Sequence, residues 1–391
     1  MTPPSPSSPA GGAVEVRAAT TRTDRAAFID LPYRAYRDLP AWRAPLRFER
    51  RAQLDPARNP ALAQIDHALF LARRDGRVVG RIAAIVNHAH LQLHHATTGH
   101  FGFLDTLAPD PEAVAALIGA AGTWLRTRGM TRIQGPFNFT VNEESGLLIE
   151  GFDTPPMIMT PHGRPDYAPA LEALGFTKVI DSHAYLYDFG ARYTIPPRVQ
   201  RLLAGFEKDS ALSLRPLDLK NFDDEIRLVM DIFNDAWADN WNFVPFSEAQ
   251  ISAMAQELRP LVRGDSLWIA MINGEPAAFC LFLPDINEIA HGLDGRVLPF
   301  GWARILYRLK LRGPKRARLP LAGVRRKFHK TQGSILAMAA VFEKGFAAQY
   351  ARGAGEIEAS WVLETNRDMI SMINLIGMRR YKTYRIYEKP L

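Results

Sequence analysis

The sequence predicts an α+β protein with mixed β-sheets, in which one arrangement of strands and helices is built twice in tandem. Its 391 residues suffice for two domains of roughly 150 residues each, and 47% of them are hydrophobic, enough for two cores. Asp75-Gly76 and Asn273-Gly274 favour tight hairpin turns, and each dipeptide separates two apolar runs. Gly76 and Gly274 lie 198 residues apart, which indicates an internal repeat.

The elements of each half follow in the order strand, helix, hairpin, strand, helix, strand, helix and strand. Alternation of apolar and polar residues predicts the strands, and helical periodicity predicts the helices. The last helix of each half ends at a glycine, Gly175 and Gly377, before a closing strand. The matching segments are 14–17 and 212–215, 28–36 and 226–237, 69–72 with 78–85 and 267–271 with 277–283, and 178–187 and 381–387.

Domain boundaries follow from this repeat. We expect a first domain at residues 13–192 and a second at 212–391, joined by a linker at 193–211. Residues 1–12 are rich in proline and serine, a composition that predicts a disordered tail.

The composition excludes several protein classes. The apolar run Ile335–Phe342 is far shorter than the roughly 18 residues of a membrane-spanning helix. The first twelve residues lack the basic start and apolar core of a secretory signal. Cys280 is the single cysteine, so the chain has no internal disulfide and no cysteine-built zinc site. We therefore expect a cytoplasmic protein.

The net charge of +7 comes from one segment. Between Arg296 and Lys330 there are twelve basic residues and no acidic one, whereas the rest of the chain has 36 basic and 41 acidic residues. The positive charge therefore predicts a property of this segment and its ligands.

The second half predicts a strand at 318–324, a polar loop at 325–333, a helix at 334–350, a strand at 356–363 and a helix opening at Asn366. This series of elements resembles the acyl-CoA-binding region of GNAT-type N-acyltransferases. In that fold, backbone N–H groups of the loop hold the pyrophosphate of CoA at a helix N-terminus. The loop departs from the usual Arg/Gln-x-x-Gly-x-Gly/Ala pattern, because HKTQGS at 329–334 has one internal glycine. An ordinary solvated turn is the alternative.

A second resemblance covers nearly the whole chain after residue 13. It joins 39–46 (LPAWRAPL), 135–146 (GPFNFTVNEESG), 151–156 (GFDTPP) and 381–387 (YKTYRIY), and it is to a bacterial branch of tandem GNAT acyltransferases that includes the bacterial ceramide synthases. The resemblance implies acyl-CoA as co-substrate, a sphingoid base as amine acceptor, no permanently bound cofactor, and direct attack in a ternary complex.

The resemblance also implies the residues that bind the thioester. Backbone N–H groups near Gly323 and Val324 would hold its carbonyl oxygen, where the strand separates from its neighbour. The remaining candidates for acyl-CoA binding are Arg325, Lys330, Gln332, Gly333, Ser334 and Asn366.

A general base for amine attack should be a carboxylate or a water relay facing the cleft. Glu358 is polar within an expected central strand, so it is either catalytic or in a salt bridge to an arginine. Glu143 and Glu144 are the other candidates because they lie in a polar loop after a strand, although a helix cap or hairpin turn explains them equally well. In the same loop, Asn138 and Asn142 are candidates for binding the amine substrate.

The general acid departs from the family pattern. A tyrosine four residues before Gly377 is usual, but that position is Ile373. Either Tyr381 or Tyr384 takes its place, or the chemistry of this half differs. The histidines between His88 and His95 come with no carboxylate or cysteine, so we expect no metal site.

Residues 299–312 predict a basic amphipathic helix. Trp302, Ile305, Leu306 and Leu309 fall on one stripe and arginines on another, which is typical of a helix that lies on an anionic membrane. It would also form a wall for an acyl chain. A helix packed on the domain core is the alternative, and nucleic acid binding is not expected because no RNA-binding motif or zinc module is present.

Three functions remain open at this stage. The first is transfer of a long-chain acyl group from acyl-CoA to a lipid amine, or to another amine. The second is a peptidoglycan-type transferase that uses charged tRNA. The third is a membrane-binding module with a degenerate site.

Overall fold

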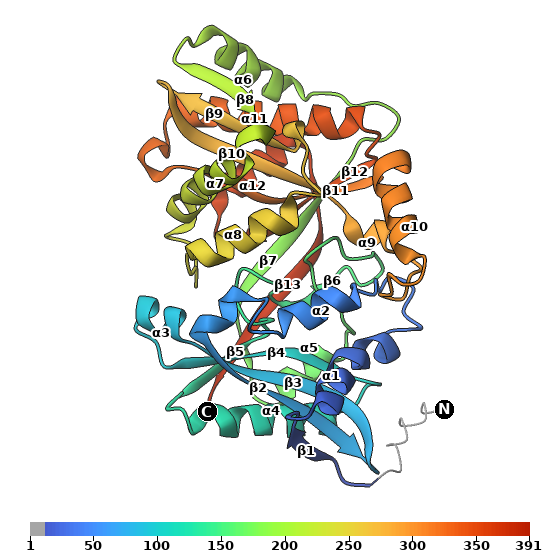
Figure 1. Cartoon of the computed structure of the whole chain (residues 1–391). Helices are drawn as coiled ribbons and strands as arrows, with labels where there is room; N and C mark the ends of the chain where they lie inside the picture. Colours follow the sequence, from blue (N-terminus) through green and yellow to red (C-terminus); the bar gives the residue numbers. More distant parts are fainter. Residues whose placement is uncertain (1–11) are drawn as a thin grey trace, which may run out of the picture.

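The computed structural model describes residues 12–391, and both halves of the chain contribute strands to one sheet of 13 strands (Figure 1). Apart from Gly12, the predicted tail 1–12 lies outside the described residues. The N-terminal half contains β1 (Glu15–Ala18), α1 (Arg22–Ala35), α2 (Arg47–Gln53), β2 (Ile65–Arg74), β3 (Arg77–Asn87), α3 (His88–His94), β4 (Thr98–Thr106), α4 (Pro111–Arg126), β5 (Arg132–Gly135), β6 (Leu147–Glu150), α5 (Tyr167–Ala173) and β7 (Thr177–Asp188). The C-terminal half contains α6 (Pro197–Lys208), β8 (Leu212–Pro216), α7 (Phe222–Trp237), α8 (Glu248–Leu258), β9 (Leu267–Ile272), β10 (Glu275–Pro284), α9 (Ile286–Ile289), α10 (Gly301–Tyr307), β11 (Arg316–Val324), α11 (Gln332–Ala351), β12 (Glu356–Leu363), α12 (Arg367–Ile376) and β13 (Arg379–Pro390).

The predicted order of elements is confirmed in both halves. The hairpin β2–β3 turns at Asp75 and Gly76, with φ angles of 51° and 75°, and β9–β10 turns at Asn273 and Gly274, with φ angles of 53° and 78°. These left-handed angles are those of the tight turns that match strand twist. Gly377 ends α12 in the left-handed region, as its position before the closing strand predicts.

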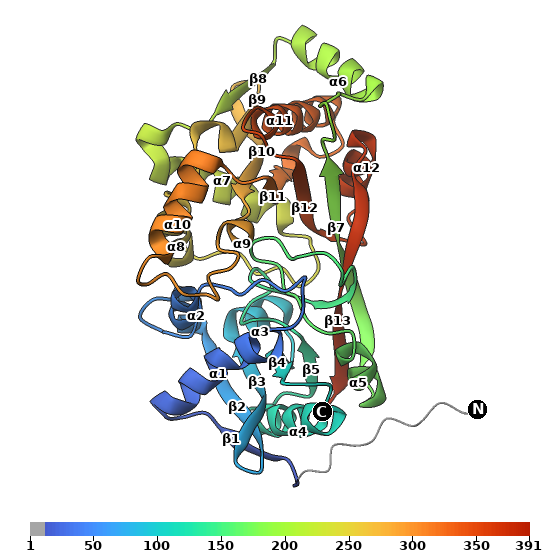
Figure 2. The same ribbon diagram turned by 90° about the vertical axis from the view of Figure 1, so that its right-hand side faces the viewer.

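The last strand of each half lies in the part of the sheet that the other half builds. The strand order is β1-β2-β3-β4-β5-β13-β7-β12-β11-β10-β9-β8, with β6 paired to β13 beside this path. Thus β13 pairs with β5 and β7 pairs with β12, both antiparallel. Figures 1 and 2 show β7 and β13 running side by side from one half into the other. The segment between residues 192 and 212 therefore separates the halves along the chain but not within the sheet.

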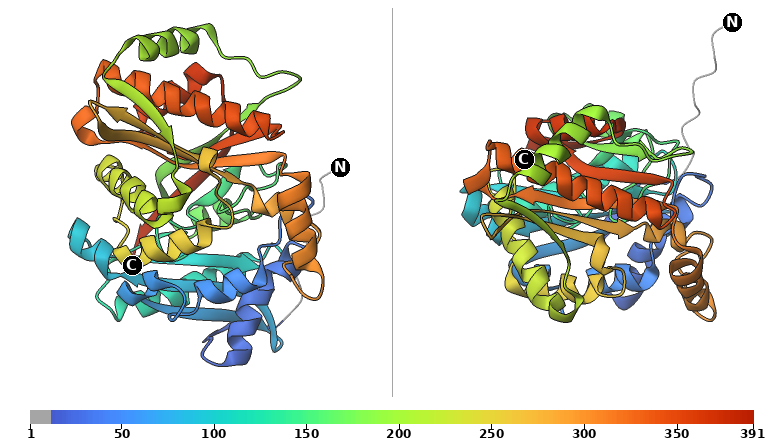
Figure 3. Two further views of the ribbon diagram at one scale, coloured as in Figure 1. Left: turned by 45° about the horizontal axis from the view of Figure 1, so that its top comes forward. Right: turned by 90° about the horizontal axis from the view of Figure 1, so that it is seen from above.

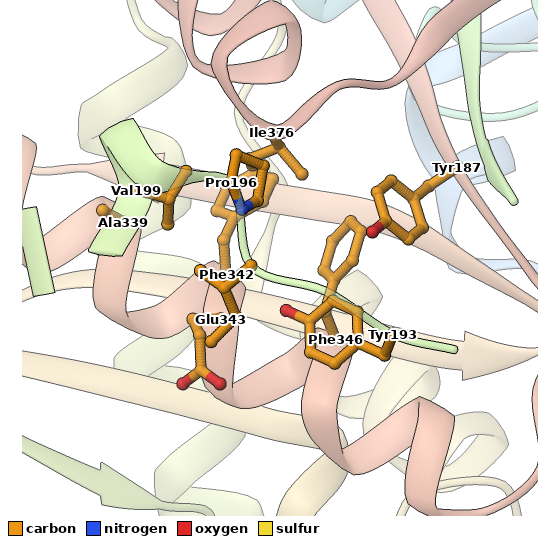
Figure 4. Close-up of a pocket in the computed structure, with 10 residues that line it drawn as sticks. Tyr187, Tyr193, Pro196, Val199, Ala339, Phe342, Glu343, Phe346 and Ile376 are labelled. Carbon is orange, nitrogen blue, oxygen red and sulfur yellow. The ribbon is translucent and has the colours of Figure 1, made fainter. Parts of the chain in front are cut away.

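Helices cover both faces of each half. In the N-terminal half α4 and α5 pack on one face and α1 on the other, and each layer has its own apolar core. In the C-terminal half α11 and α12 cover one face, while α7 and α8 cover the opposite one. The expected linker 193–211 contains α6, which packs on α11 (Figure 3). A small apolar pocket lies between these two helices, with Val199, Phe342 and Phe346 among its walls (Figure 4).

The parallel strands β11 and β12 separate after a short paired stretch. Their pairing runs from Arg316 opposite Glu356 to Leu319 opposite Ala359 and then ends. A cleft opens between the diverging ends, because no strand hydrogen bonds join them there. The separation begins before Gly323, earlier than the sequence suggested.

The corresponding separation in the N-terminal half is filled by the chain itself. Strands β4 and β5 pair only from Thr98 to His100. Beyond that point Phe137 N donates to Phe101 O at 2.7 Å, and Phe103 N donates to the side chain of Asn138 at 2.8 Å. A Cβ on Gly102 would lie 1.8 Å from Phe137 O, so the segment after β5 closes this gap at backbone contact.

The predicted amphipathic helix at 299–312 is shorter and oriented differently than expected. Its α-helical part is α10, followed by a wider π turn at Arg308–Arg312. Ile305 and Leu309 pack inward against an apolar cluster around Ile286 and Ile289, whereas Trp302 is 56% exposed. The four residues therefore do not form one exposed stripe. No helix within residues 12–391 has the length and apolar character to cross a membrane.

Candidate active site

Glu358 is a completely buried carboxylate on the central strand β12. Its neighbours Ile357 and Ala359 pack into the core beneath α11, so Glu358 and Ser360 point from the opposite face of the sheet. A buried carboxylate is costly unless charged and hydrogen-bonding partners surround it. Glu358 has such partners on three sides.

Arg318 and Ser360 bind one oxygen of this carboxylate. Arg318 lies directly opposite Glu358 in the parallel pairing of β11 and β12, with its Nε 3.5 Å from Glu358 Oε1. Ser360 Oγ donates to the same oxygen at 2.5 Å and accepts from Arg318 Nε at 2.9 Å. The arginine also donates to the backbone oxygens of Ser360 and Ile158. The salt bridge considered as an alternative for Glu358 is therefore present, and it lies within a larger network.

Tyr381 binds the other oxygen. Its hydroxyl donates to Glu358 Oε2, and burial together with the nearby carboxylate raises the pKa of Tyr381 well above its usual range. The phenol therefore keeps its proton at neutral pH. Tyr384 is also fully buried, with its pKa raised by burial, and its hydroxyl has no hydrogen-bond partner within residues 12–391. Ile373, at the usual tyrosine position, packs in the core.

The GFDTPP segment of the N-terminal half covers this cluster. Lys382 Nζ donates to the backbone oxygens of Gly151 at 2.6 Å and Thr154 at 2.7 Å, and burial lowers the pKa of Lys382 to about 8. Gly151 has a φ of 87°, and a Cβ there would lie 2.4 Å from Tyr381 O. Glycine at this position therefore lets the covering segment approach β13 closely.

A second ion pair lies near Glu358, and both of its residues also bind the backbone of the N-terminal half. Asp285, at the end of β10, is fully buried and accepts from Ile158 N at 2.9 Å. Arg316 donates to Asp285 at 3.2 Å and to the backbone oxygen of Pro155 at 3.2 Å. Burial raises the pKa of Asp285 to about 7. The polar cluster around Glu358 thus lies where residues of both halves meet.

The cleft between β11 and β12 leads to the same cluster. It is open to solvent on one side, and its cavity volume is about 40 Å³. Its walls are largely apolar, and Ser360 belongs both to these walls and to the Glu358 network. The other lining residues are Trp237, Leu319, Pro320, Ala322, Ala359, Trp361, Val362, Asn366 and Met369.

The residues predicted to contact acyl-CoA lie at and around the end of β11. Gly323 and Val324 pair with Phe279 and Ala278 of β10, beyond the cleft-lining part of the strand. Asn366 lines the cleft, but its side-chain oxygen caps α12 by accepting from a backbone N–H at 3.1 Å.

The predicted phosphate-binding loop ends at the N-terminus of the long helix α11. Thr331 caps this helix by accepting from Ser334 N at 3.2 Å, and Gln332, which is exposed, and Gly333, which is partly buried, form its first turn. Lys330 is exposed, whereas Arg325 pairs with Asp231 at 2.6 Å. The helix dipole and Lys330 are thus accessible to an anion, and Arg325 is held by a carboxylate of α7.

Glu143 and Glu144 belong to a separate cluster. Glu144 pairs with Arg50 of α2, and Glu143 accepts from Gln53 at 2.7 Å. Burial raises the pKa of Glu143 to about 8. No hydrogen bond or ion pair in the described part of the chain connects this cluster to Glu358.

The two asparagines predicted to bind the amine lie in the same loop, and their side chains donate hydrogen bonds to other residues of the protein. Asn138 donates to Glu144 at 2.7 Å, while Asn142 donates to the backbone oxygen of Val244 at 2.9 Å and so joins the two halves. Trp302 lies in α10 and is 56% exposed. Between residues 12 and 391 no group of three or more possible ligands is arranged to hold a metal.

Sequence reasoning missed Arg318, Ser360, Asp285 and Lys382 as site residues. A signal existed for two of them, because Arg318 and Ser360 occupy strand positions that share the face of Glu358. No local pattern marks Lys382, since its partners are backbone oxygens of Gly151 and Thr154 in the other half of the chain. Asp285 shows only a local helix cap, on Asn287 N, whereas its ion pair with Arg316 and its bond to Ile158 N depend on the tertiary structure.

Known proteins resemble this chain over nearly its full length. No family model matches it. Protein YghO of Escherichia coli K12 is 40% identical over 379 residues, which cover 96% of this chain and 95% of that protein. The bacterial ceramide synthase of Caulobacter vibrioides is 41% identical over 366 residues, which cover 93% and 94% of the two chains.

Solved structures show the same fold. A tandem GNAT protein from the clavulanic acid biosynthesis pathway aligns over 96% of this chain and 98% of its own, with a TM-score of 0.58 and 14% identity. A GCN5-related N-acetyltransferase from Sphaerobacter thermophilus aligns over 96% and 95% of the two chains, with a TM-score of 0.50 and 13% identity. The tandem arrangement and the sequence identity lead to the same conclusion: the chain belongs to the bacterial ceramide synthase family of tandem GNAT-type N-acyltransferases.

Proposed function

We propose that this protein transfers a long-chain fatty acyl group from acyl-CoA to the amine of a sphingoid base, sphinganine or its 3-oxo form. The product is a dihydroceramide-type amide. The observation that carries the proposal is the cleft between β11 and β12, in a chain 41% identical to a bacterial ceramide synthase. This cleft is apolar and ends at a hydroxyl bound to a buried carboxylate, which suits a thioester and an amine that must lose a proton.

Acyl transfer from a thioester to an amine needs positioned substrates, a base that accepts a proton from the amine, and a hydrogen-bond donor to the thioester oxygen. Glu358 would accept the proton of the amine, while backbone N–H groups near Gly323 and Val324 would hold the thioester oxygen. Tyr381, which keeps its proton, would hold the carboxylate of Glu358 in place, and the leaving thiolate would take a proton from the attacking nitrogen. Lys330 and the first turn of α11 would bind the phosphates of CoA.

The geometry favours the C-terminal half as the working half. Its strands separate into a lined cleft, whereas the equivalent gap between β4 and β5 is closed by Phe137 and Asn138. The N-terminus of α4, the helix after β4, is also unsuited to binding phosphate. Asp110 caps its N-terminus and pairs with Arg74, so a carboxylate already occupies the position that an anion would take.

We further propose that α10 and its flanks touch the inner face of the cytoplasmic membrane, where a lipid amine would be met. Six large apolar side chains are exposed between residues 298 and 311, among basic residues and no acidic ones. Exposed aromatic and aliphatic groups interspersed with arginine suit the interface of an anionic lipid layer. The exposed residues are Leu298, Phe300, Trp302, Leu306, Tyr307 and Leu311.

The test is incubation of the purified protein with palmitoyl-CoA and single amines, followed by mass spectrometry of the lipids. The amines are sphinganine, 3-oxosphinganine, a simple long-chain alkylamine and glucosamine. We expect an N-acyl product with the sphingoid bases and release of free CoA in equal amount. Amide formed only with another amine would move the assignment to that acceptor, and no amide with any amine would overturn the proposal.

A further inference from the structure

Glu358 is poorly placed to touch an amine directly. Its side chain is 0% exposed, and both of its oxygens are occupied by donors, Ser360 and Tyr381. Ser360 is the residue of this network that also lines the cleft. A proton that travels from the cleft to Glu358 must therefore cross the hydroxyl of Ser360.

The hydrogen bonds of Ser360 orient it for this transfer. A serine hydroxyl has one proton and two lone pairs. The proton is directed to Glu358 Oε1 at 2.5 Å, and one lone pair accepts from Arg318 Nε at 2.9 Å. Arg318 is fully buried and cannot accept a proton, so it fixes the rotamer without competing for the transfer. One lone pair of Oγ is left for a group in the cleft.

We infer that Ser360 relays the proton of the acceptor amine from the cleft to Glu358, and that Arg318 is the positioning residue that holds the relay. This inference rests on the proposed function. The ammonium gives one proton to Ser360 Oγ as the proton of that hydroxyl moves to Glu358. The neutral amine then attacks the thioester carbon, and the C–S bond breaks. CoA leaves as a thiolate and takes the second proton released by the nitrogen, and Glu358 returns its proton to solvent through Ser360.

Tyr381 does not offer an equivalent route, because it is absent from the walls of the cleft. It approaches Glu358 from β13, on the far side of β7, and binds the other carboxylate oxygen. The two hydroxyls therefore have different tasks: Ser360 carries a proton between the cleft and Glu358, and Tyr381 holds the carboxylate in place.

The test compares Ser360→Ala with the wild type across pH 6.5 to 10, with palmitoyl-CoA and sphinganine. At pH 7 we expect kcat to fall by about 100-fold or more, as for loss of a general-base path, with the KM for acyl-CoA changed less than about threefold. The loss should shrink as pH rises, because solvent then deprotonates the amine. A purely structural role would give the same loss at every pH.

Matched variants complete the experiment. Ser371→Ala removes an exposed hydroxyl on α12 that bonds only to its own helix, and should leave activity unchanged. Ser360→Thr keeps the relaying oxygen and should retain the pH profile of the wild type, whatever its rate. A pH-independent loss in Ser360→Ala, a loss below threefold at pH 7, or an alanine-like profile in Ser360→Thr overturns the relay. An inactive wild type would instead overturn the proposed function.

Discussion

Tyr381 donates a hydrogen bond to Glu358 across the intervening strand β7, so a residue of the last strand completes the surroundings of a carboxylate two strands away. The contact exists because β7 and β13 are exchanged between the halves of the sheet. Neither half alone contains the complete cluster, since Ile158 and Gly151 of the N-terminal half also bind its charged groups.

Tyr381→Phe removes the hydroxyl and keeps the ring. Glu358 then loses one of its donors in a buried site, which costs about 1–3 kcal/mol of unfolding free energy. We expect kcat to fall about tenfold or more, because a carboxylate held by fewer donors is less well positioned. Urea unfolding and steady-state rates measure the two effects. Tyr350→Phe, which changes an exposed tyrosine of α11, is the control and should alter neither. Unchanged stability in Tyr381→Phe would contradict the contact.

The pH dependence of the stability of Glu143→Gln tests the polar cluster of Glu143 and Glu144. Burial raises the pKa of Glu143 from 4.5 to about 8, so the folded protein binds this proton more tightly than the unfolded chain. Its contribution to stability is therefore full at low pH and is lost as pH rises from about 4.5 through about 8. Glutamine carries no such proton. We expect the variant to be more stable than the wild type by about 1 kcal/mol or more at pH 9, and no more stable at pH 4.

Thermal unfolding across pH 4 to 9 measures this difference. The exposed Glu112→Gln is the matched control, and its stability relative to the wild type should stay nearly constant over that range. A difference between Glu143→Gln and the wild type that does not grow with pH would show that the carboxyl of Glu143 ionises normally.

Gly102→Ala tests the closure of the N-terminal half. The added Cβ would lie 1.8 Å from Phe137 O and 2.6 Å from Phe137 C, and these backbone atoms leave it no space. We expect a loss of about 3 kcal/mol or more, or failure to fold, by analogy with the largest core substitutions. Gly119→Ala is the matched control, because a Cβ there meets nothing within 4 Å inside α4. That change should stabilise the protein by about 0.5–1 kcal/mol, since alanine favours the helix. Differential scanning calorimetry of both variants measures the change in stability. A well-folded Gly102→Ala would show that the gap between β4 and β5 has room for a side chain, and the N-terminal half would again be a candidate for the active site.

Trp302 and Leu306 test the proposed membrane surface. Both are at least half exposed, so replacing them by alanine should leave the fold intact. We expect the double variant to bind vesicles that contain phosphatidylglycerol about tenfold more weakly, because two apolar groups no longer enter the lipid interface. Leu219→Ala removes an equally exposed leucine outside this surface and should bind as the wild type does. Flotation with vesicles gives the binding, and equal flotation of the two variants would exclude α10 as the contact.

Part of the candidate site could be predicted from the sequence. Glu358 could be singled out because alternation along a strand shows which residues share a face, and a charged residue among buried positions needs partners. The hairpin turns at Gly76 and Gly274 could be placed because few dipeptides adopt their backbone angles. Tyr381 and Tyr384 could not be told apart, because both lie in one strand and only the tertiary structure brings Glu358 of another strand to the hydroxyl of Tyr381.

The amino-acid order thus determined which elements form and which way their side chains face, since local conformational preferences and side-chain periodicity act within a few residues. The tertiary structure decided which strands became neighbours. It placed β11 beside β12, which brought Arg318 to Glu358 and Ser360, and it placed β7 beside β12 and β13 beside β7, which brought Tyr381 to the same carboxylate. The physical reason is that backbone hydrogen bonds between strands are alike in any pairing, so the choice of partner depends on the packing of side chains far apart in the chain.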